Sequence, residues 1–287
     1  MFQQPIDFRE ESTALYDLIV PHDDAVFELQ TQFKNWTVND VLTHLHVWNI
    51  AADLSLKDAD AFAAFFEQVA AAVGDGKSLR VFEQSYLNGL RGRALLETWR
   101  DYFGEMTERF LTADPKKRVK WAGPDMSVRS SIAARLMETW AHGQEVYDAL
   151  GVERVNGDRI KNIAVLGVNT FGWTFANRGL DVPSPAPHVR LTAPSGELWT
   201  WNDPSEDNLV EGAATEFCQV VTQVRNIADT ELRVVGETAQ RWMSIAQCFA
   251  GPPETPPVPG TRYCQKAGPS PRVRKSASRR GRCDNDR

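Results

Sequence analysis

Three residues of the chain, two His and one Glu, combine metal-binding side chains with a spacing that could bring them together. His44 lies in the run Trp36 to Leu45 (WTVNDVLTHL), and Glu138 and His142 lie in the run 138–144 (ETWAHGQ). A helix places residues four apart on one face, so the second pair would stack there. If the first run supplies a facing helix, two imidazoles and a carboxylate would occupy three coordination positions of a metal ion. The fourth position would stay open to water or substrate, as in catalytic metal sites.

Residues one turn away from these ligands are candidates for holding a substrate. Arg135 precedes Glu138 by one turn, so it could pair with that carboxylate or point into a pocket and hold an anionic substrate. Trp48 follows His44 by one turn and is the second candidate. His46 lies about 200° around the helix from His44. We therefore predict that His46 faces away and that His46→Ala keeps the metal.

A less specific interpretation also has weight. A Glu and a His four residues apart are common on solvated helices, and a lone His beside Leu and Val is more often a packed residue than a ligand. Two features favour the metal site. Leu42 and Leu45 flank His44, and apolar residues surround Glu138 and His142, which indicates burial. A buried carboxylate is costly unless it is paired or binds a metal, and four-helix bundles build metal sites from facing helices.

The elements that must position these residues are helices with apolar periodicity. Thr37 is a good N-cap for the helix that carries His44, and Asp40 three residues later completes a weak form of the capping box. Ser127 or Ser130 caps the helix that carries Glu138, and that helix ends at Gly151. The predicted helices span approximately residues 8–20, 37–56, 58–73, 90–111, 127–150 and 160–179. We expect them to form one helical domain over residues 1–182.

The pattern changes after the proline-rich stretch 183–187, which indicates a domain boundary. Residues 188–192 and 197–201 predict a hairpin around a Ser195–Gly196 turn, followed by a helix at 212–224, a strand at 231–235 and a helix at 237–249. This predicts a small α+β domain over residues 188–251. The Pro-rich and then basic remainder, 252–287, lacks apolar periodicity and is predicted to be a disordered tail.

Composition restricts the classes of function. The 287 residues are 42% apolar and 24% charged, as in a soluble globular protein, and the N-terminus lacks the features of a signal peptide. No apolar run approaches the ~20 residues that span a bilayer, so we expect a cytoplasmic protein without membrane contact. Residues 262–287 carry nine Lys or Arg and two Asp, a net +7, so the rest of a chain whose total is −6 stands at −13. An acidic body argues against nucleic-acid binding by the folded part.

The two runs, WTVNDVLTHL and, about ninety residues later, ETWAHGQEVYDALG, resemble the metal-binding domain of the mycothiol-dependent maleylpyruvate isomerase family. That family belongs to the DinB-like superfamily of four-helix bundles. The resemblance covers residues 8–260 approximately, and implies an α+β protein with a DinB-like four-helix bundle followed by a small domain. It also implies that His44, Glu138 and His142 bind a divalent metal, zinc in the family.

The C-terminal region carries a second resemblance. Residues 187–251 approximately are similar to the sterol-carrier-like domain attached to such bundles, a region also labelled a wyosine-base-formation domain. The family's substrate-binding arginine has no clear counterpart there. Arg190, Arg225, Arg233 and Arg241 are the candidates.

These expectations define competing functions. A metal held by two neutral imidazoles and one carboxylate favours the anion of a bound water or thiol. Because neither run contains a Cys, the nucleophile would be a low-molecular-weight thiol, which the resemblance implies is mycothiol, with glutathione or another thiol as alternatives. The protein would be a thiol-dependent transferase or isomerase acting on a small-molecule substrate. The alternatives are a metal-binding or small-ligand-binding protein without turnover and a protein of tRNA wyosine modification. A homodimer is one assembly left open.

Overall fold

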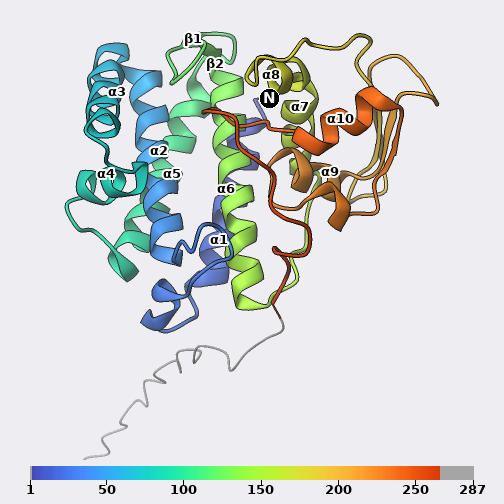
Figure 1. Cartoon of the computed structure of the whole chain (residues 1–287). Coiled ribbons are helices and arrows are strands. Elements are labelled where there is room, and N and C mark those ends of the chain that lie inside the picture. The colour runs from blue at the N-terminus through green and yellow to red at the C-terminus, as the bar shows by residue number, and fades with distance from the viewer. Residues whose placement is uncertain (1, 266–287) are drawn as a thin grey trace, which may run out of the picture.

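The computed structural model describes residues 2–265, in which a four-helix bundle lies beside a smaller part that contains a sheet (Figure 1). In the bundle, the first and second of the four helices each pack on both the third and the fourth, which closes the arrangement. These helices are α1 (Gln4–Ile19), α2 (Val38–Lys57), α5 (Gly92–Thr112) and α6 (Val128–Leu150). Two further helices, α3 (Ala59–Gly74) and α4 (Leu79–Tyr86), pack on α2. The α+β class and the helical N-terminal region are therefore as predicted.

The two helices that carry the candidate ligands have well-defined ends. At the start of α2, Thr37 Oγ1 accepts a hydrogen bond from Asp40 N (3.2 Å), and Asp40 Oδ2 accepts one from Thr37 N (2.9 Å). This is a complete capping box, as predicted. Ser127 Oγ accepts from Ser130 N at the start of α6, and Gly151 ends that helix in the left-handed region with φ of 68°.

Two helical predictions need correction. Helix α4 was not predicted, although Ser78 caps it and apolar residues at Leu79, Phe82 and Tyr86 repeat with helical spacing. The helix predicted at 160–179 is divided into α7 (Lys161–Asn169) and α8 (Phe171–Ala176). Thr170 lies at the break, where its hydroxyl donates to Leu166 O (2.8 Å) and Gly167 O (3.1 Å) while its backbone N also donates to Leu166 O (3.0 Å).

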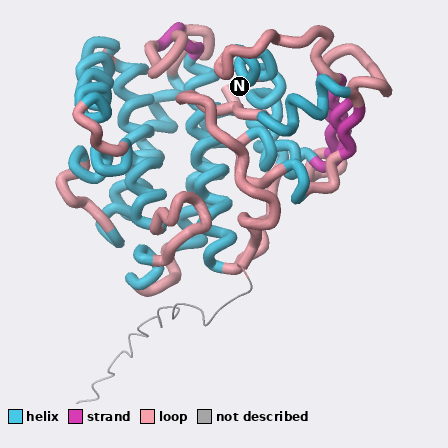
Figure 2. Tube along the Cα trace, in the orientation of Figure 1, coloured by secondary structure: helices cyan, strands magenta, loops and turns pink. Residues whose placement is uncertain are grey.

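The smaller part contains a four-stranded sheet (magenta, at the right of Figure 2). Its strands are β3 (His188–Thr192), β4 (Leu198–Trp201), β5 (Leu209–Ala213) and β6 (Arg233–Val235). They lie in the order β4-β3-β5-β6, with β3 and β5 parallel and the other neighbouring pairs antiparallel. The predicted hairpin is present, and the helix predicted at 212–224 is present as α9 (Ala214–Val221), but it is preceded by β5, a strand that was not predicted. That strand escaped the sequence pattern because it lies between two others, so Leu209 and Val210 are both buried and do not alternate. Strand β6 is followed by the helix α10 (Glu237–Ile245). A separate two-stranded hairpin, β1 (Arg118–Val119) and β2 (Met126–Ser127), precedes α6.

A continuous hydrophobic core joins the bundle to the smaller part. Helix α7 approaches α9 closely at Gly167, where a Cβ would lie 2.8 Å from Val221 Cγ2 and 3.0 Å from Phe217 Cε1. The boundaries proposed at 182 and 188 stay predictions. No helix within residues 2–265 is long and apolar enough to cross a membrane.

The tail predicted from residue 252 begins with a segment, 252–265, that contacts the folded part and runs beside α6 (red in Figure 1). Arg178 Nη2 donates to Glu254 O (2.6 Å), Arg262 pairs with Glu145 (3.1 Å), and Gln265 N donates to Asp148 O (2.9 Å). The pattern of apolar residues missed this segment because polar contacts to residues far away in sequence hold it in place. The rest of the predicted tail, 266–287, lies outside the described residues.

The contact between α7 and α9 gives a test of this packing. We expect Gly167→Val to lower the free energy of unfolding by about 1–3 kcal/mol more than Gly104→Val, since overpacking a filled core carries a cost of that size. Gly104 lies in α5 with no atom within 4 Å of a Cβ position, so it controls for helix propensity. Chemical denaturation measures both, and equal losses would contradict the close approach.

Candidate metal centre

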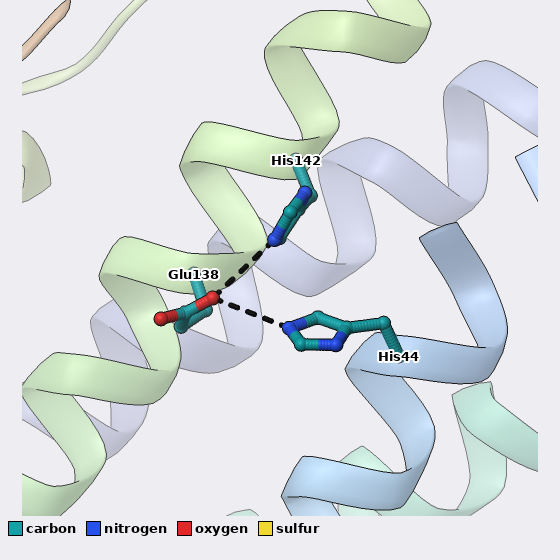
Figure 3. A group of neighbouring side chains, drawn as sticks. All are labelled: His44, Glu138 and His142. Carbon is teal, nitrogen blue, oxygen red and sulfur yellow. Dashed lines mark hydrogen bonds and ion pairs between the residues drawn. The ribbon is translucent and has the colours of Figure 1, made fainter. Parts of the chain in front are cut away.

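The structure brings the three candidate ligands together between α2 and α6 (Figure 3). Glu138 Oε2 lies 3.4 Å from His44 Nε2 and 3.4 Å from His142 Nε2. One ligand atom from each residue lies within 4.8 Å of the other two. A single carboxylate oxygen therefore links imidazoles that come from two different helices and are about a hundred residues apart.

This arrangement fits a small divalent ion. Ligand atoms at 2.0–2.2 Å from a tetrahedral zinc ion lie about 3.4 Å apart, which matches the two spacings to Glu138. Two His and one Glu are also a ligand set of catalytic zinc sites, which keep a further position open. The side chains of His44, Glu138 and His142 are 11%, 22% and 12% exposed, so the group is not sealed from solvent.

The charges of the group are strongly coupled. Burial alone would lower the pKa of His44, but the negative charges of Glu83 and Glu138 outweigh it and raise the pKa to about 9. Burial would raise the pKa of Glu138, yet hydrogen bonds with His142 and His44 hold it well below its usual range. The pKa of His142 is lowered, mainly by burial. Without a metal, one proton on His44 thus compensates the carboxylates, and a cation would have to replace that proton.

Sequence reasoning missed Glu83, which lies behind His44. Its Oε1 is 2.8 Å from His44 Nδ1 and accepts a hydrogen bond from Trp48 Nε1, also at 2.8 Å. The residue is completely buried. It escaped detection because α4 was not predicted, although the Ser78 cap and the apolar spacing of that segment could have revealed the helix.

The two predicted substrate-binding residues adjoin the group. Arg135 is 2% exposed, and its Nε donates to Asn49 Oδ1 (3.0 Å), whereas its Nη2 has no hydrogen-bond partner among residues 2–265. Burial lowers the pKa of Arg135 to about 10, so it stays charged at neutral pH. The ring of Trp48 lies 6.2 Å from that of His44, centroid to centroid. A role of either residue in substrate binding remains a prediction.

Aromatic side chains from the loop before α2 surround His142. The Trp36 ring stacks on the imidazole, with centroids 5.5 Å apart and planes at 9°, and the Phe33 ring meets it edge-on at 5.1 Å. The Arg262 guanidinium lies over the ring of Phe33, 5.1 Å from its centroid. The segment 252–265 therefore contacts the loop that holds one of the candidate ligands.

Comparison with known proteins places the helical part in a family. Residues 8–147 match the model of the mycothiol maleylpyruvate isomerase N-terminal domain. This helical part of the chain belongs to that domain family. The chain is also similar to two Mycobacterium tuberculosis proteins, with 38% identity to each over 248 residues. They are uncharacterized protein MT0041 of strain CDC 1551 / Oshkosh and uncharacterized protein Rv0036c of strain ATCC 25618 / H37Rv. Those alignments cover 86% of this chain and 95% of each relative.

The fold is also similar to that of a solved enzyme structure. The crystal structure of the mycothiol-dependent maleylpyruvate isomerase aligns with a TM-score of 0.49 and 15% sequence identity, over 76% of this chain and 87% of that chain. A point mutant of the same isomerase aligns with the same TM-score and 14% identity.

His46, which the sequence predicts to face away from the metal, lies apart from the three candidate ligands. His46 packs its ring against Tyr102, with centroids 5.2 Å apart, and burial lowers its pKa to about 4. It is not part of the group formed by His44, Glu138 and His142. This agrees with the helical spacing, which turns His46 away from His44.

The four candidate arginines of the C-terminal part have partners of their own. Arg190 and Arg233 both pair with Glu211, in a row of charged residues across the sheet. The other two contact a carboxylate and a ring: Arg225 pairs with Asp148 and Arg241 lies over Phe175. No sequence signal distinguished these roles, because each partner is far away along the chain.

The contact of Glu145 with Arg262 predicts a pH dependence of stability. Burial is the main cause that raises the pKa of Glu145 to about 7, with partial compensation by Arg262. The folded protein therefore binds more protons than the unfolded chain between the unperturbed value of 4.5 and about 7. We expect the stability of the wild type relative to Glu145→Gln to fall by about 3 kcal/mol as pH rises through that window.

Denaturant unfolding at several pH values between 4 and 8 measures this difference. Glu153→Gln, which replaces an exposed carboxylate just after α6, is the control. A constant difference between the wild type and Glu145→Gln would contradict a raised pKa at this position.

Proposed function

We propose that this protein is a divalent-metal-dependent enzyme that uses a low-molecular-weight thiol as cosubstrate to transfer or isomerise an electrophilic small molecule. The observation that carries the proposal is the approach of Glu138 Oε2 to two imidazoles at 3.4 Å each. We propose zinc as the metal, with His44, Glu138 and His142 as its ligands. The match of residues 8–147 to the mycothiol maleylpyruvate isomerase N-terminal domain supports a thiol cosubstrate, with mycothiol as the first candidate.

The chemistry of the site follows from its charges. A divalent ion at this place stabilises the anion of a thiol and so makes a thiolate available near neutral pH. Glu83 and Glu138 together supply two negative charges, and Arg135 supplies one positive charge. With a divalent ion in place of the His44 proton, the group carries a net charge of about +1, which one monoanion neutralises. A thiolate satisfies that requirement.

The protein's own residues would position the reactants. Glu138 and His142 come from one helix and His44 from another, so the packing of α2 on α6 sets the geometry of the ligands. The free Nη2 of Arg135 could donate to an anionic group of the substrate, since a guanidinium recognises carboxylates well. The ring of Trp48 is the proposed apolar contact.

The two buried thiols of the described residues are poor candidates for the nucleophile. Cys218 and Cys248 are buried, and burial raises the pKa of both, so each stays protonated. A protonated thiol is a weak nucleophile. This favours a cosubstrate as the source of the thiolate.

Metal content tests the ligands directly. We expect about one zinc ion per wild-type chain by elemental analysis, and a large loss in His44→Ala and Glu138→Ala, because each removes one of only three protein ligands. His46→Ala is the matched control in the same helix and should retain the metal. Unchanged zinc in both ligand variants would contradict the assignment.

Activity tests the thiol. With maleylpyruvate and other electrophiles as trial substrates, we expect consumption that requires mycothiol or another small thiol. His142→Ala should lower the rate by at least about 100-fold, since even residues that only support ligands contribute 10–100-fold. His22→Ala, a histidine in the loop after α1, is the control. Zinc binding without thiol-dependent consumption by the wild type would instead favour a non-catalytic metal-binding protein.

A further inference from the structure

Glu83 is a buried carboxylate whose position is not explained by stability. It is 0% exposed, and its ion pair within residues 2–265 is with His44. Its Oε2 is buried and has no hydrogen-bond partner among those residues. Burying a carboxylate is costly, and an unpartnered oxygen adds to the cost. A residue placed only to fill the space between α4 and α2 would cost less as an apolar side chain of similar size.

The contacts of Glu83 are specific to one nitrogen of one imidazole. Oε1 lies 2.8 Å from His44 Nδ1, while His44 Nε2 faces Glu138 Oε2 on the other side of the ring. An acceptor at Nδ1 keeps the proton on that nitrogen and leaves the Nε2 lone pair for a cation. The same contact fixes the rotation of the ring. Carboxylates in this position also make the ligating nitrogen more basic.

Trp48 completes the arrangement from the same helix as His44. Its Nε1 donates to the same Oε1 of Glu83 at 2.8 Å, so this carboxylate oxygen is held by two donors one helical turn apart on α2. The indole nitrogen is therefore already engaged within the protein. This contact gives Trp48 a second role, to hold Glu83, which is independent of any contact with substrate.

We propose that Glu83 is the positioning residue of the metal centre: it orients His44 through Nδ1, fixes the tautomer that presents Nε2 to the cation, and is itself held by Trp48. The inference rests on the proposed metal-binding function. It assigns α4, which lies outside the four-helix bundle, to the support of the site. The site therefore requires three helices in contact: α6 and α2 carry the proposed ligands, and α4 carries the residue that orients His44.

The test compares zinc affinity in the wild type, Glu83→Gln and Glu83→Leu by competition with a chelator. We expect zinc to bind Glu83→Gln about 10–100-fold more weakly than the wild type, the usual effect of losing such a carboxylate, and Glu83→Leu more weakly still. Glu83→Gln has nearly the same shape and keeps an acceptor oxygen, so it isolates the charge. Glu67→Gln, on the exposed side of α3, should bind zinc as the wild type does.

A spectroscopic measurement separates positioning from a merely structural role. In the zinc-loaded wild type, nitrogen-15 NMR of the histidines should show His44 protonated at Nδ1 and ligating through Nε2. In the Glu83 variants the protonated Nδ1 signal should shift or broaden as the ring loses its fixed partner. Thermal unfolding of the metal-free proteins checks that Glu83→Gln is folded.

The outcomes are distinct. Zinc affinity and His44 resonances in Glu83→Gln equal to those of the wild type would overturn the role of Glu83 while leaving the metal function intact. A wild type that binds no zinc would instead overturn the proposed function and this inference with it. Weaker zinc binding with altered His44 resonances in Glu83→Gln alone, and not in Glu67→Gln, would support the positioning role.

Discussion

The sharing of one Glu138 oxygen between two imidazoles is the interaction on which the candidate site depends. Because His44 belongs to α2 and His142 to α6, the contact exists only while these helices keep their register and distance. The caps at Thr37 and Ser127 determine where each helix begins, and so which turn faces the neighbour. Packing of α2 on α5 and of α6 on α1 then holds them in that relation.

Electrostatic compensation explains why the bundle interior tolerates these groups. Two carboxylates, at Glu83 and Glu138, lie beside one guanidinium, at Arg135, so a further positive charge is needed. A proton on His44 meets that need in the metal-free protein, which is why its pKa is raised. A divalent cation bound at the same place would do more than replace the proton, since it would leave an excess positive charge that attracts an anionic ligand. The same buried charges are therefore compatible with the proposed metal and thiolate.

The C-terminal part of the chain is connected to the site through the segment 252–265. Arg262 pairs with Glu145, one turn beyond His142 on α6, and also lies over Phe33, whose ring contacts His142. Lys34 of the same loop pairs with Glu254. The α+β part thus contributes to the surroundings of a ligand that the helical part carries, and the continuous core between the two parts keeps this relation fixed.

The sequence by itself determined the helical class, the cap at Thr37, the facing of His44 away from His46, and the three residues that now lie together. These features follow from helical periodicity and local side-chain hydrogen bonds, which act within a few residues. Only the tertiary structure decided that Glu83 contacts His44, that β5 is a central strand and that Arg262 and Gln265 contact the end of α6. These depend on contacts between residues far apart in the chain, and burial on both sides or polar anchoring leaves no periodic pattern to read.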